Sequence, residues 1–141
     1  EVPKEFPRVY DNKIVWLDNR NFREVYMYDL GTDGVYGTGD DSGEIQVTPP
    51  CLAPYYCYRG GLNIYEDKIV WADDRHVIDQ VYVGPQVYMY DLLTDQEIPI
   101  TSSITSYKGA NGPAIYGNKI VWNDARNTNI DIYLAEFASA N

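Results

Sequence analysis

The chain has 141 residues, and its 21 acidic against 11 basic side chains give a formal net charge of −10 with the single histidine neutral. This excess of acid argues against an electrostatic nucleic-acid binder, because such a protein needs surplus Lys and Arg to neutralise phosphates. Apolar residues make up 45% of the chain and 14 residues are tyrosine, which is too much burial potential for a disordered protein. No apolar run approaches the roughly 18 residues of a spanning helix. The composition therefore predicts a folded protein without a membrane span.

Three internal repeats organise the sequence. Each contains the tetrapeptide KIVW, followed after one residue by Asp-x-Arg and then by a Tyr-rich segment of the type VYMYDL. The first two repeats end in a fourth segment, Glu-Ile-x-x-Thr, which the third repeat lacks. The KIVW copies lie at 13–16, 68–71 and 119–122, and the Tyr-rich copies lie at 25–30, 87–92 and 132–137.

The repeated segments are predicted to be strands. Each is short, rich in β-branched and aromatic residues, and bounded by Gly, Asn or Asp. Tight turns are expected at 11–12, 66–67 and 117–118, because Asn, Asp and Gly tolerate the positive φ of hairpin turns. Within KIVW the Ile and Trp lie on one face of the strand and the Val on the other, so both faces are expected to be buried between stacked sheets.

An antiparallel meander of about 40 to 50 residues repeated around an axis describes the blades of a β-propeller. We therefore expect an all-β fold of three four-stranded blades, the last incomplete, at about 5–49, 60–102 and 112–138 of a single region spanning 1–141. Three blades cannot close a ring, because known propellers have at least about four. Either the chain is a piece of a longer protein or copies assemble. A dimer that completes a six-bladed ring is the preferred assembly and an open filament the alternative.

The order of these segments resembles a known family. An Ile-Tyr first strand, KIVWxDxR, a Tyr-Met-Tyr-Asp-Leu third strand and an Ile-Thr fourth strand are similar to the TolB-like β-propeller repeats of archaeal and bacterial surface and exported proteins. The resemblance covers essentially the whole chain and implies a propeller. For function it implies a scaffold, a binding module or an enzyme appendage, because such propellers serve all three roles.

The first repeat carries an acidic, glycine-rich insertion between its expected third and fourth strands. Its five carboxylates are the candidate metal ligands Asp29, Asp33, Asp40, Asp41 and Glu44. Ca²⁺ takes six to eight oxygen ligands from a loop that curls around it, and glycines permit the sharp turns. The match to the twelve-residue calcium loop is partial, since Gly31 stands where an oxygen side chain is expected. A Ca²⁺ site is predicted, with a solvated acidic turn as the alternative.

Cys51 and Cys57 bracket a Pro-containing connection between the first and second repeats. Two cysteines without clustered histidines do not supply the four ligands of a zinc site. A local disulfide is therefore the favoured interpretation, and two buried free thiols are the alternative. A disulfide implies an oxidising compartment, so the protein is expected to be extracellular or at the cell surface.

The second repeat contains an apolar insertion at 77–85 between its second and third expected strands. One interpretation is a lengthened hairpin that packs on itself. The other is a partner-binding protrusion, because loops on rigid scaffolds often carry function.

The repeated Asp-x-Arg groups are predicted to be structural, since a catalytic site usually breaks symmetry. The sequence contains no nucleophile elbow, phosphate loop, dinucleotide fingerprint or His-based metal motif. We therefore expect a non-enzymatic, exported scaffold or adhesion module of a cell envelope or extracellular assembly, with a second copy or other envelope proteins as partners. The alternatives are a glycan- or peptide-binding module and half of an oligomeric enzyme. The unrepeated tyrosines that are free for ligand contact are Tyr55, Tyr56, Tyr58 and Tyr107.

Overall fold

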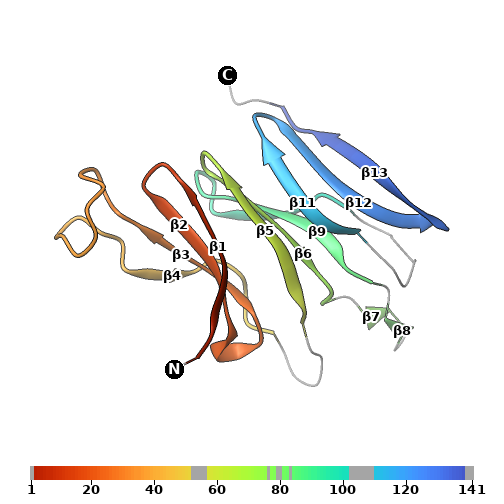
Figure 1. Ribbon diagram of the computed structural model, residues 1–141, viewed down its shortest axis with the longest axis horizontal. Helices are drawn as coiled ribbons and strands as arrows, with labels where there is room; N and C mark the ends of the chain where they lie inside the picture. The colour runs from red at the N-terminus through yellow and green to blue at the C-terminus, as the bar shows by residue number, and fades with distance from the viewer. Residues whose placement is uncertain are drawn as a thin grey trace.

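The computed structural model describes residues 2–51, 57–75, 77–78, 81–82, 84–101 and 110–138. Three antiparallel sheets, one for each repeat, lie side by side along the molecule (Figure 1). The described residues contain one short 3₁₀ helix, η1 (Asn19–Asn21), and no α-helix. The expectation of an all-β fold of repeated antiparallel sheets is confirmed. No helix in the described part of the chain is both long and apolar enough to cross a membrane.

The strands follow the repeats in chain order. The first sheet has the order β1-β2-β3-β4, with β1 (Lys4–Tyr10), β2 (Lys13–Asp18), β3 (Glu24–Asp29) and β4 (Glu44–Gln46). The second sheet has the order β10-β9-β6-β5, with β5 (Arg59–Tyr65), β6 (Lys68–Asp73), β9 (Gln86–Asp91) and β10 (Gln96–Pro99). The third has the order β11-β12-β13, with β11 (Ala110–Tyr116), β12 (Lys119–Asn127) and β13 (Asn129–Glu136). As expected, the described residues add no fourth strand to the third sheet.

The insertion in the second repeat forms a small hairpin of its own. Its strands β7 (Val77–Ile78) and β8 (Val81–Tyr82) pair with each other as a separate two-stranded sheet. The hairpin extends from the end of β6 at the lower edge of the molecule in Figure 1. The interpretation as a lengthened hairpin is therefore confirmed at the level of the backbone.

The expected turns are present, and their backbone geometry is repeated. The first turn residue has positive φ in every sheet, with 49° at Asp11, 51° at Glu66 and 58° at Gly117. A bulge in the first strand also recurs, at Phe6, Gly61 and Gly112, again with positive φ. Equal positions in the repeats therefore adopt equal conformations, even where the residue type differs.

The registers place Trp opposite Tyr in all three sheets. Trp16 pairs with Tyr26, Trp71 with Tyr88 and Trp122 with Tyr133. Their rings stack with centroids 6.1, 6.0 and 6.2 Å apart. We call the face that carries these pairs the Trp face and the opposite face the Val face. The Val-face residues used below are Val15, Val25 and Met27 in the first sheet, Val70, Val87 and Met89 in the second, and Val121, Ile132 and Leu134 in the third.

The core consists of two apolar layers, one between each pair of neighbouring sheets. In the first layer the Val face of the first sheet packs against the Trp face of the second, where Ile69 and Trp71 are fully buried. In the second layer the Val face of the second sheet packs against Ile120 and Trp122 of the third. Both faces of the middle sheet are therefore buried, as the apolar residues on both sides of KIVW predict.

The first strands of the three sheets lie next to one another (Figure 1). The tyrosines at their ends form a row: the ring centroids are 4.9 Å apart both between Tyr10 and Tyr65 and between Tyr65 and Tyr116. β1, β5 and β11 are therefore the edge strands along which the three sheets are aligned.

Candidate functional site

The acidic insertion brings three of its five carboxylates together. Asp33, Asp40 and Asp41 each offer an oxygen atom, and these atoms all lie within 4.8 Å of one another. Asp29 instead accepts a hydrogen bond from the backbone N–H of Gly31 at 3.0 Å. Glu44 forms ion pairs with Lys4 and with Arg20. Only the three clustered aspartates therefore form a candidate metal site, which we call the Asp triad.

Donors in the same loop and on β3 hold the Asp triad in place. The Thr38 hydroxyl donates to Asp40 at 2.8 Å, and the Tyr28 hydroxyl donates to Asp41 at 2.6 Å. The hydrogen bonds from Thr38 and Thr32 lower the pKa of Asp40 to about 2, and the bond from Tyr28 lowers the pKa of Asp41. The same bond raises the pKa of Tyr28 to about 12. Asp40 and Asp41 are thus ionised at neutral pH, which is the form that binds a hard cation.

The structure explains why Gly31 stands where the calcium-loop template has an oxygen side chain. Gly31 has φ +67°, and a Cβ at this position would lie 2.7 Å from the Asp40 carbonyl oxygen and closer still to its carboxylate. A side-chain ligand at this position would therefore displace Asp40 from the triad. With one oxygen from each, the three carboxylates supply at most half of the six to eight oxygens that Ca²⁺ prefers, so backbone carbonyls or water would have to complete its coordination.

The Asp-x-Arg groups build the same network in every sheet. The members are Asp18 and Arg20 in the first sheet, Asp73 and Arg75 in the second, and Asp124 and Arg126 in the third. Each Asp is at most 1% exposed. It accepts hydrogen bonds from the side chain and backbone N–H of its Arg and, at 3.3 to 3.4 Å, from the Trp indole of KIVW. Each guanidinium also lies over the Tyr ring opposite that Trp, 4.2 to 4.4 Å from the ring centroid.

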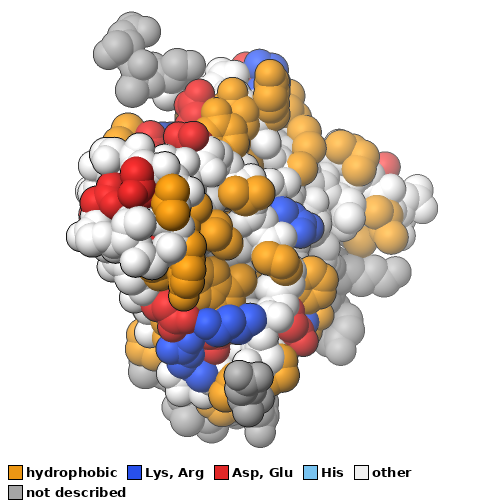
Figure 2. Space-filling model, turned by 60° about the vertical axis from the view of Figure 1, so that its left-hand side comes forward, with side chains coloured by type: hydrophobic (Ala, Val, Ile, Leu, Met, Phe, Trp, Pro, Cys, Tyr) orange, Lys and Arg blue, Asp and Glu red, His pale blue; other side chains and the backbone are white. Residues whose placement is uncertain are grey.

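The Trp face of the first sheet has no sheet packed against it in the described chain, and it contains a hollow of about 190 Å³. Its lining residues are Lys4, Ile14, Trp16, Tyr28, Tyr36 and Glu44. The ring of Tyr36, from the acidic insertion, lies 5.2 Å from that of Tyr28. Figure 2 turns this side forward and shows hydrophobic side chains gathered between acidic side chains and a group of Lys and Arg.

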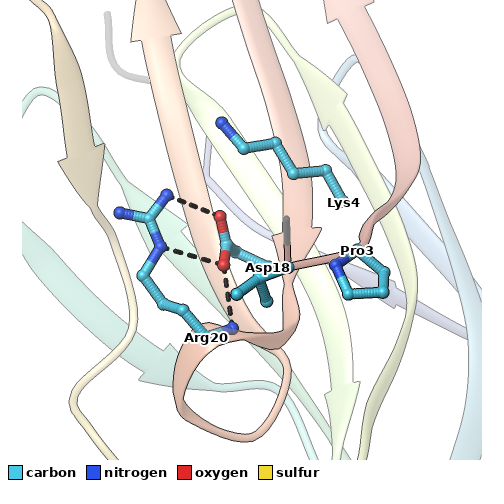
Figure 3. A pocket seen from close by; sticks show the side chains of 5 residues that line it. Pro3, Lys4, Asp18 and Arg20 are labelled. Atoms are coloured by element: carbon cyan, nitrogen blue, oxygen red, sulfur yellow. Dashed lines mark hydrogen bonds and ion pairs between the residues drawn. The ribbon is translucent and has the colours of Figure 1, made fainter.

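A second hollow lies beside the first, at the start of β1 and the end of β2. It is lined by Val2, Pro3, Lys4, Asp18 and Arg20 (Figure 3). The guanidinium of Arg20 is turned toward the Asp18 carboxylate, and the hydrogen bonds from Arg20 lower the pKa of Asp18 to about 2. Asp18 is therefore held as an anion by its own partner.

Sequence reasoning missed two residues of this surface, Lys4 and Tyr36. Tyr36 is an unrepeated aromatic inside an insertion, which is a signal that could have identified it. Lys4 is a single basic residue whose role depends on Glu44, 40 positions further along the chain. Of the unrepeated tyrosines singled out above, Tyr58 lies under the guanidinium of Arg23, with 4.4 Å between the guanidinium carbon and the ring centroid. The others, Tyr55, Tyr56 and Tyr107, lie outside the described residues.

Cys51 and Cys57 form a disulfide, with their Cα atoms 5.8 Å apart. The predicted pairing is confirmed. The bridge lies in the segment between the first and second sheets, so it restrains the connection between these two sheets.

No protein-family model and no curated protein matches this sequence. Among solved structures, the chain is similar to one described as the crystal structure of the computationally designed Ika4 protein. The TM-score is 0.54 at 12% sequence identity, and the match covers 96% of this chain and 66% of the Ika4 chain. At this identity the similarity concerns the fold alone, and this chain spans only part of the length of that protein.

Proposed function

We propose that this chain is a non-enzymatic scaffold or adhesion module of a cell envelope or extracellular assembly, built from three blades of a TolB-like β-propeller. The support for the propeller is the repetition of one strand order, one register and one face-to-face packing mode in successive sheets. Blades of a propeller are small antiparallel sheets that repeat around an axis in this manner.

The observation that supports the scaffold role is that the repeated polar groups bond to one another inside the sheets. The carboxylates of Asp18, Asp73 and Asp124 are buried and bonded within their own sheets. They are therefore poorly placed to act on a substrate. The surfaces that stay available for binding in the described chain are the outer faces of the first and third sheets. Large exposed apolar surfaces mark interaction sites.

The disulfide supports an extracellular or cell-surface location, because such bridges persist in oxidising environments and are rare in the cytosol. The Asp triad is proposed to bind Ca²⁺, which is abundant outside cells and binds extracellular modules at high micromolar to millimolar concentration.

A second candidate function is the binding of a glycan or peptide in the hollow of the first sheet. The observation that favours it is the combination of Tyr28, Tyr36 and Trp16 with the charged pair Lys4 and Glu44. Aromatic rings next to a few polar groups are typical of small-ligand sites.

These proposals are tested by binding and turnover assays on the same preparation. The immobilised chain should bind an envelope protein saturably, while a panel of hydrolase substrates stays unchanged. Saturable binding to a glycan or peptide array that Tyr36→Ala abolishes would instead favour the second candidate. Turnover that Asp18→Asn or Asp73→Asn abolishes without unfolding the protein would contradict both.

A further inference from the structure

The Val face of the third sheet is open, although its counterparts are buried. Val121, Ile132 and Leu134 are 37%, 75% and 55% exposed. The residues at the same positions of the first sheet, Val15, Val25 and Met27, are 0%, 0% and 6% exposed, because the second sheet covers them. The corresponding residues of the second sheet are at most 3% exposed beneath the third sheet. The third sheet therefore presents the same apolar surface without a cover in the described chain.

The first sheet shows the complementary situation on its Trp face. Val9 on β1 is 68% exposed, whereas its counterparts Ile64 and Ile115 are 5% and 7% exposed beneath the preceding sheet. Ile14 is partly exposed, whereas Ile69 and Ile120 are completely buried. The two ends of the molecule thus carry the two halves of one kind of interface.

From this complementarity we propose that a second copy of the chain docks head to tail, so that the Trp face of its first sheet covers the Val face of the third sheet. The inference rests on the proposed scaffold role and names its partner. In both internal layers a Val face packs on a Trp face. A contact between copies would continue this established packing.

The number of sheets favours two copies. A heterologous contact that repeats with a constant rotation closes into a ring if the rotation permits. Propellers commonly have about four to eight blades, so two copies with three sheets each fall inside this range and three copies fall outside it. Each copy in such a dimer would bury both of its open faces.

The row of tyrosines points to the same arrangement. Tyr10 and Tyr116 each contact Tyr65, but the ring of Tyr116 is left at the open end of the row and is 77% exposed. Docking of a second copy would place its Tyr10 next to Tyr116, as Tyr10 and Tyr65 lie within one chain. The net charge of −10 makes copies repel one another, so docking through apolar faces should strengthen when salt screens that repulsion.

Light scattering coupled to size exclusion in about 150 mM salt provides the first test. The 141-residue chain, of 16.1 kDa, should elute with twice that mass. The double variant Ile132→Glu/Leu134→Glu should have the mass of one chain, because it places two carboxylates in the interface. Val9→Glu should behave likewise. Leu93→Glu is the matched control: Leu93 is 70% exposed on the β9–β10 turn, away from both faces, and this variant should remain dimeric.

All three variants change only exposed side chains, so the fold should survive, which the near-ultraviolet circular dichroism of the stacked Trp–Tyr pairs will verify. A mixture of Val9→Glu with Ile132→Glu/Leu134→Glu should restore a two-chain species, since one intact Trp face then meets one intact Val face. If the wild-type protein instead forms species larger than two chains, and each variant abolishes them, the proposed contact stands, but the copies form an open chain and not a ring.

Two results would overturn the inference. One is a wild-type chain that stays monomeric at concentrations on the order of 100 μM; the other is a Val9→Glu variant that remains fully dimeric, which would indicate a symmetric contact between two Val faces. Neither result affects the scaffold role, which a monomer that binds another envelope protein would retain. Conversely, a dimer with catalytic turnover would contradict the scaffold role and leave the docking mode standing.

Discussion

Arg59 on β5 donates its Nε–H to the Asp73 carboxylate of β6 at 2.8 Å, and the two side chains are 1% and 0% exposed. The same guanidinium donates to the carbonyl oxygen of Pro49 at 3.0 Å, in the segment that leaves the first sheet. By register, Lys4 faces Asp18 and Ala110 faces Asp124 at the corresponding places. Asp73 is therefore the Asp-x-Arg carboxylate that, in the described residues, also bonds a guanidinium from a neighbouring strand.

Replacing Asp73 by Asn should destabilise the protein by about 3–5 kcal/mol, because Arg59 would be left buried without its carboxylate. Burial raises the pKa of Asp73, but the hydrogen bond from Arg75 and the charge of Arg59 outweigh this effect and lower the pKa overall, so the carboxylate is charged. Asp124→Asn is the matched control and should cost less, since its partner Arg126 is 37% exposed and can be solvated. Urea denaturation of both variants measures the difference, and equal losses would contradict this role of Arg59.

Replacing Glu24 by Gln should stabilise the protein at neutral pH. Glu24 is 0% exposed, and burial raises the pKa of its carboxyl group above the ordinary 4.5 despite the nearby charge of Arg59. The folded state therefore favours the protonated form, and this contribution to stability is lost as the pH rises through the raised pKa. The melting temperatures of wild type and Glu24→Gln should approach each other near pH 4 and diverge toward pH 8. The second sheet already has Gln86 at this position, bonded to Thr101. A variant that melts lower at pH 8 would refute this prediction.

Replacing Gly61 by Ala should cost about 2–4 kcal/mol. Gly61 has φ +63°, and an added Cβ would lie 2.6 Å from Pro113 Cδ and 2.9 Å from Gly112 Cα. The clash falls where β5 meets β11, so the layer between the second and third sheets would have to open. Gly39→Ala serves as the control, because no heavy atom of the described residues, apart from Gly39 and its two chain neighbours, lies within 4 Å of the point that its Cβ would occupy. A loss confined to about 0.5 kcal/mol in both variants would show that the sheets separate easily.

Reduction of the Cys51–Cys57 disulfide should lower the free energy of unfolding by about 2 kcal/mol, the value expected for so short a loop, whose cysteines are six positions apart. Thiol reagents should label nothing in the native protein and two cysteines after reduction under denaturing conditions. Denaturation with and without reductant measures the stability change. Full labelling before reduction would show that both thiols are free and remove the support for export.

Millimolar Ca²⁺ should raise the melting temperature, because a ligand that binds only the folded state adds about 2.7 kcal/mol at one hundred times its dissociation constant. Mg²⁺ should act much less, since it demands tighter octahedral geometry. The shift should vanish in Asp33→Asn/Asp40→Asn and persist in Glu44→Gln, because Glu44 lies with Lys4 and Arg20 and not in the Asp triad. Equal melting temperatures in Ca²⁺ and in chelator would indicate that the loop is an acidic turn that binds no Ca²⁺.

The strand pattern could be predicted from the sequence because its causes are local. Alternation within KIVW places Val15 and Trp16 on opposite faces, and the turn at Asp11 follows from the residues beside it. The recurrence of these segments also predicts equal registers in the three sheets. The disulfide could be predicted for a simpler reason, since the chain contains only two cysteines.

The candidate sites depended on contacts between residues far apart in the sequence. The sequence shows only that all five acidic residues of the insertion carry a carboxylate. In the structure Glu44 pairs with Lys4 and Arg20, while Thr38 and Tyr28 hold Asp40 and Asp41 together. Such pairings exist only once β1 to β4 are assembled into one sheet.

Burial between sheets was likewise decided by tertiary structure. Arg59 and Lys4 occupy the same position of the repeat, yet within the described residues a preceding sheet covers Arg59 alone of the two, and its charge is therefore buried against Asp73. The same reason separates Val15, which is fully buried, from Val121, which is exposed. The sequence by itself determined the strands and their two apolar faces. The stacking of the sheets decided which of those faces are buried, because burial is set by neighbours that are distant along the chain.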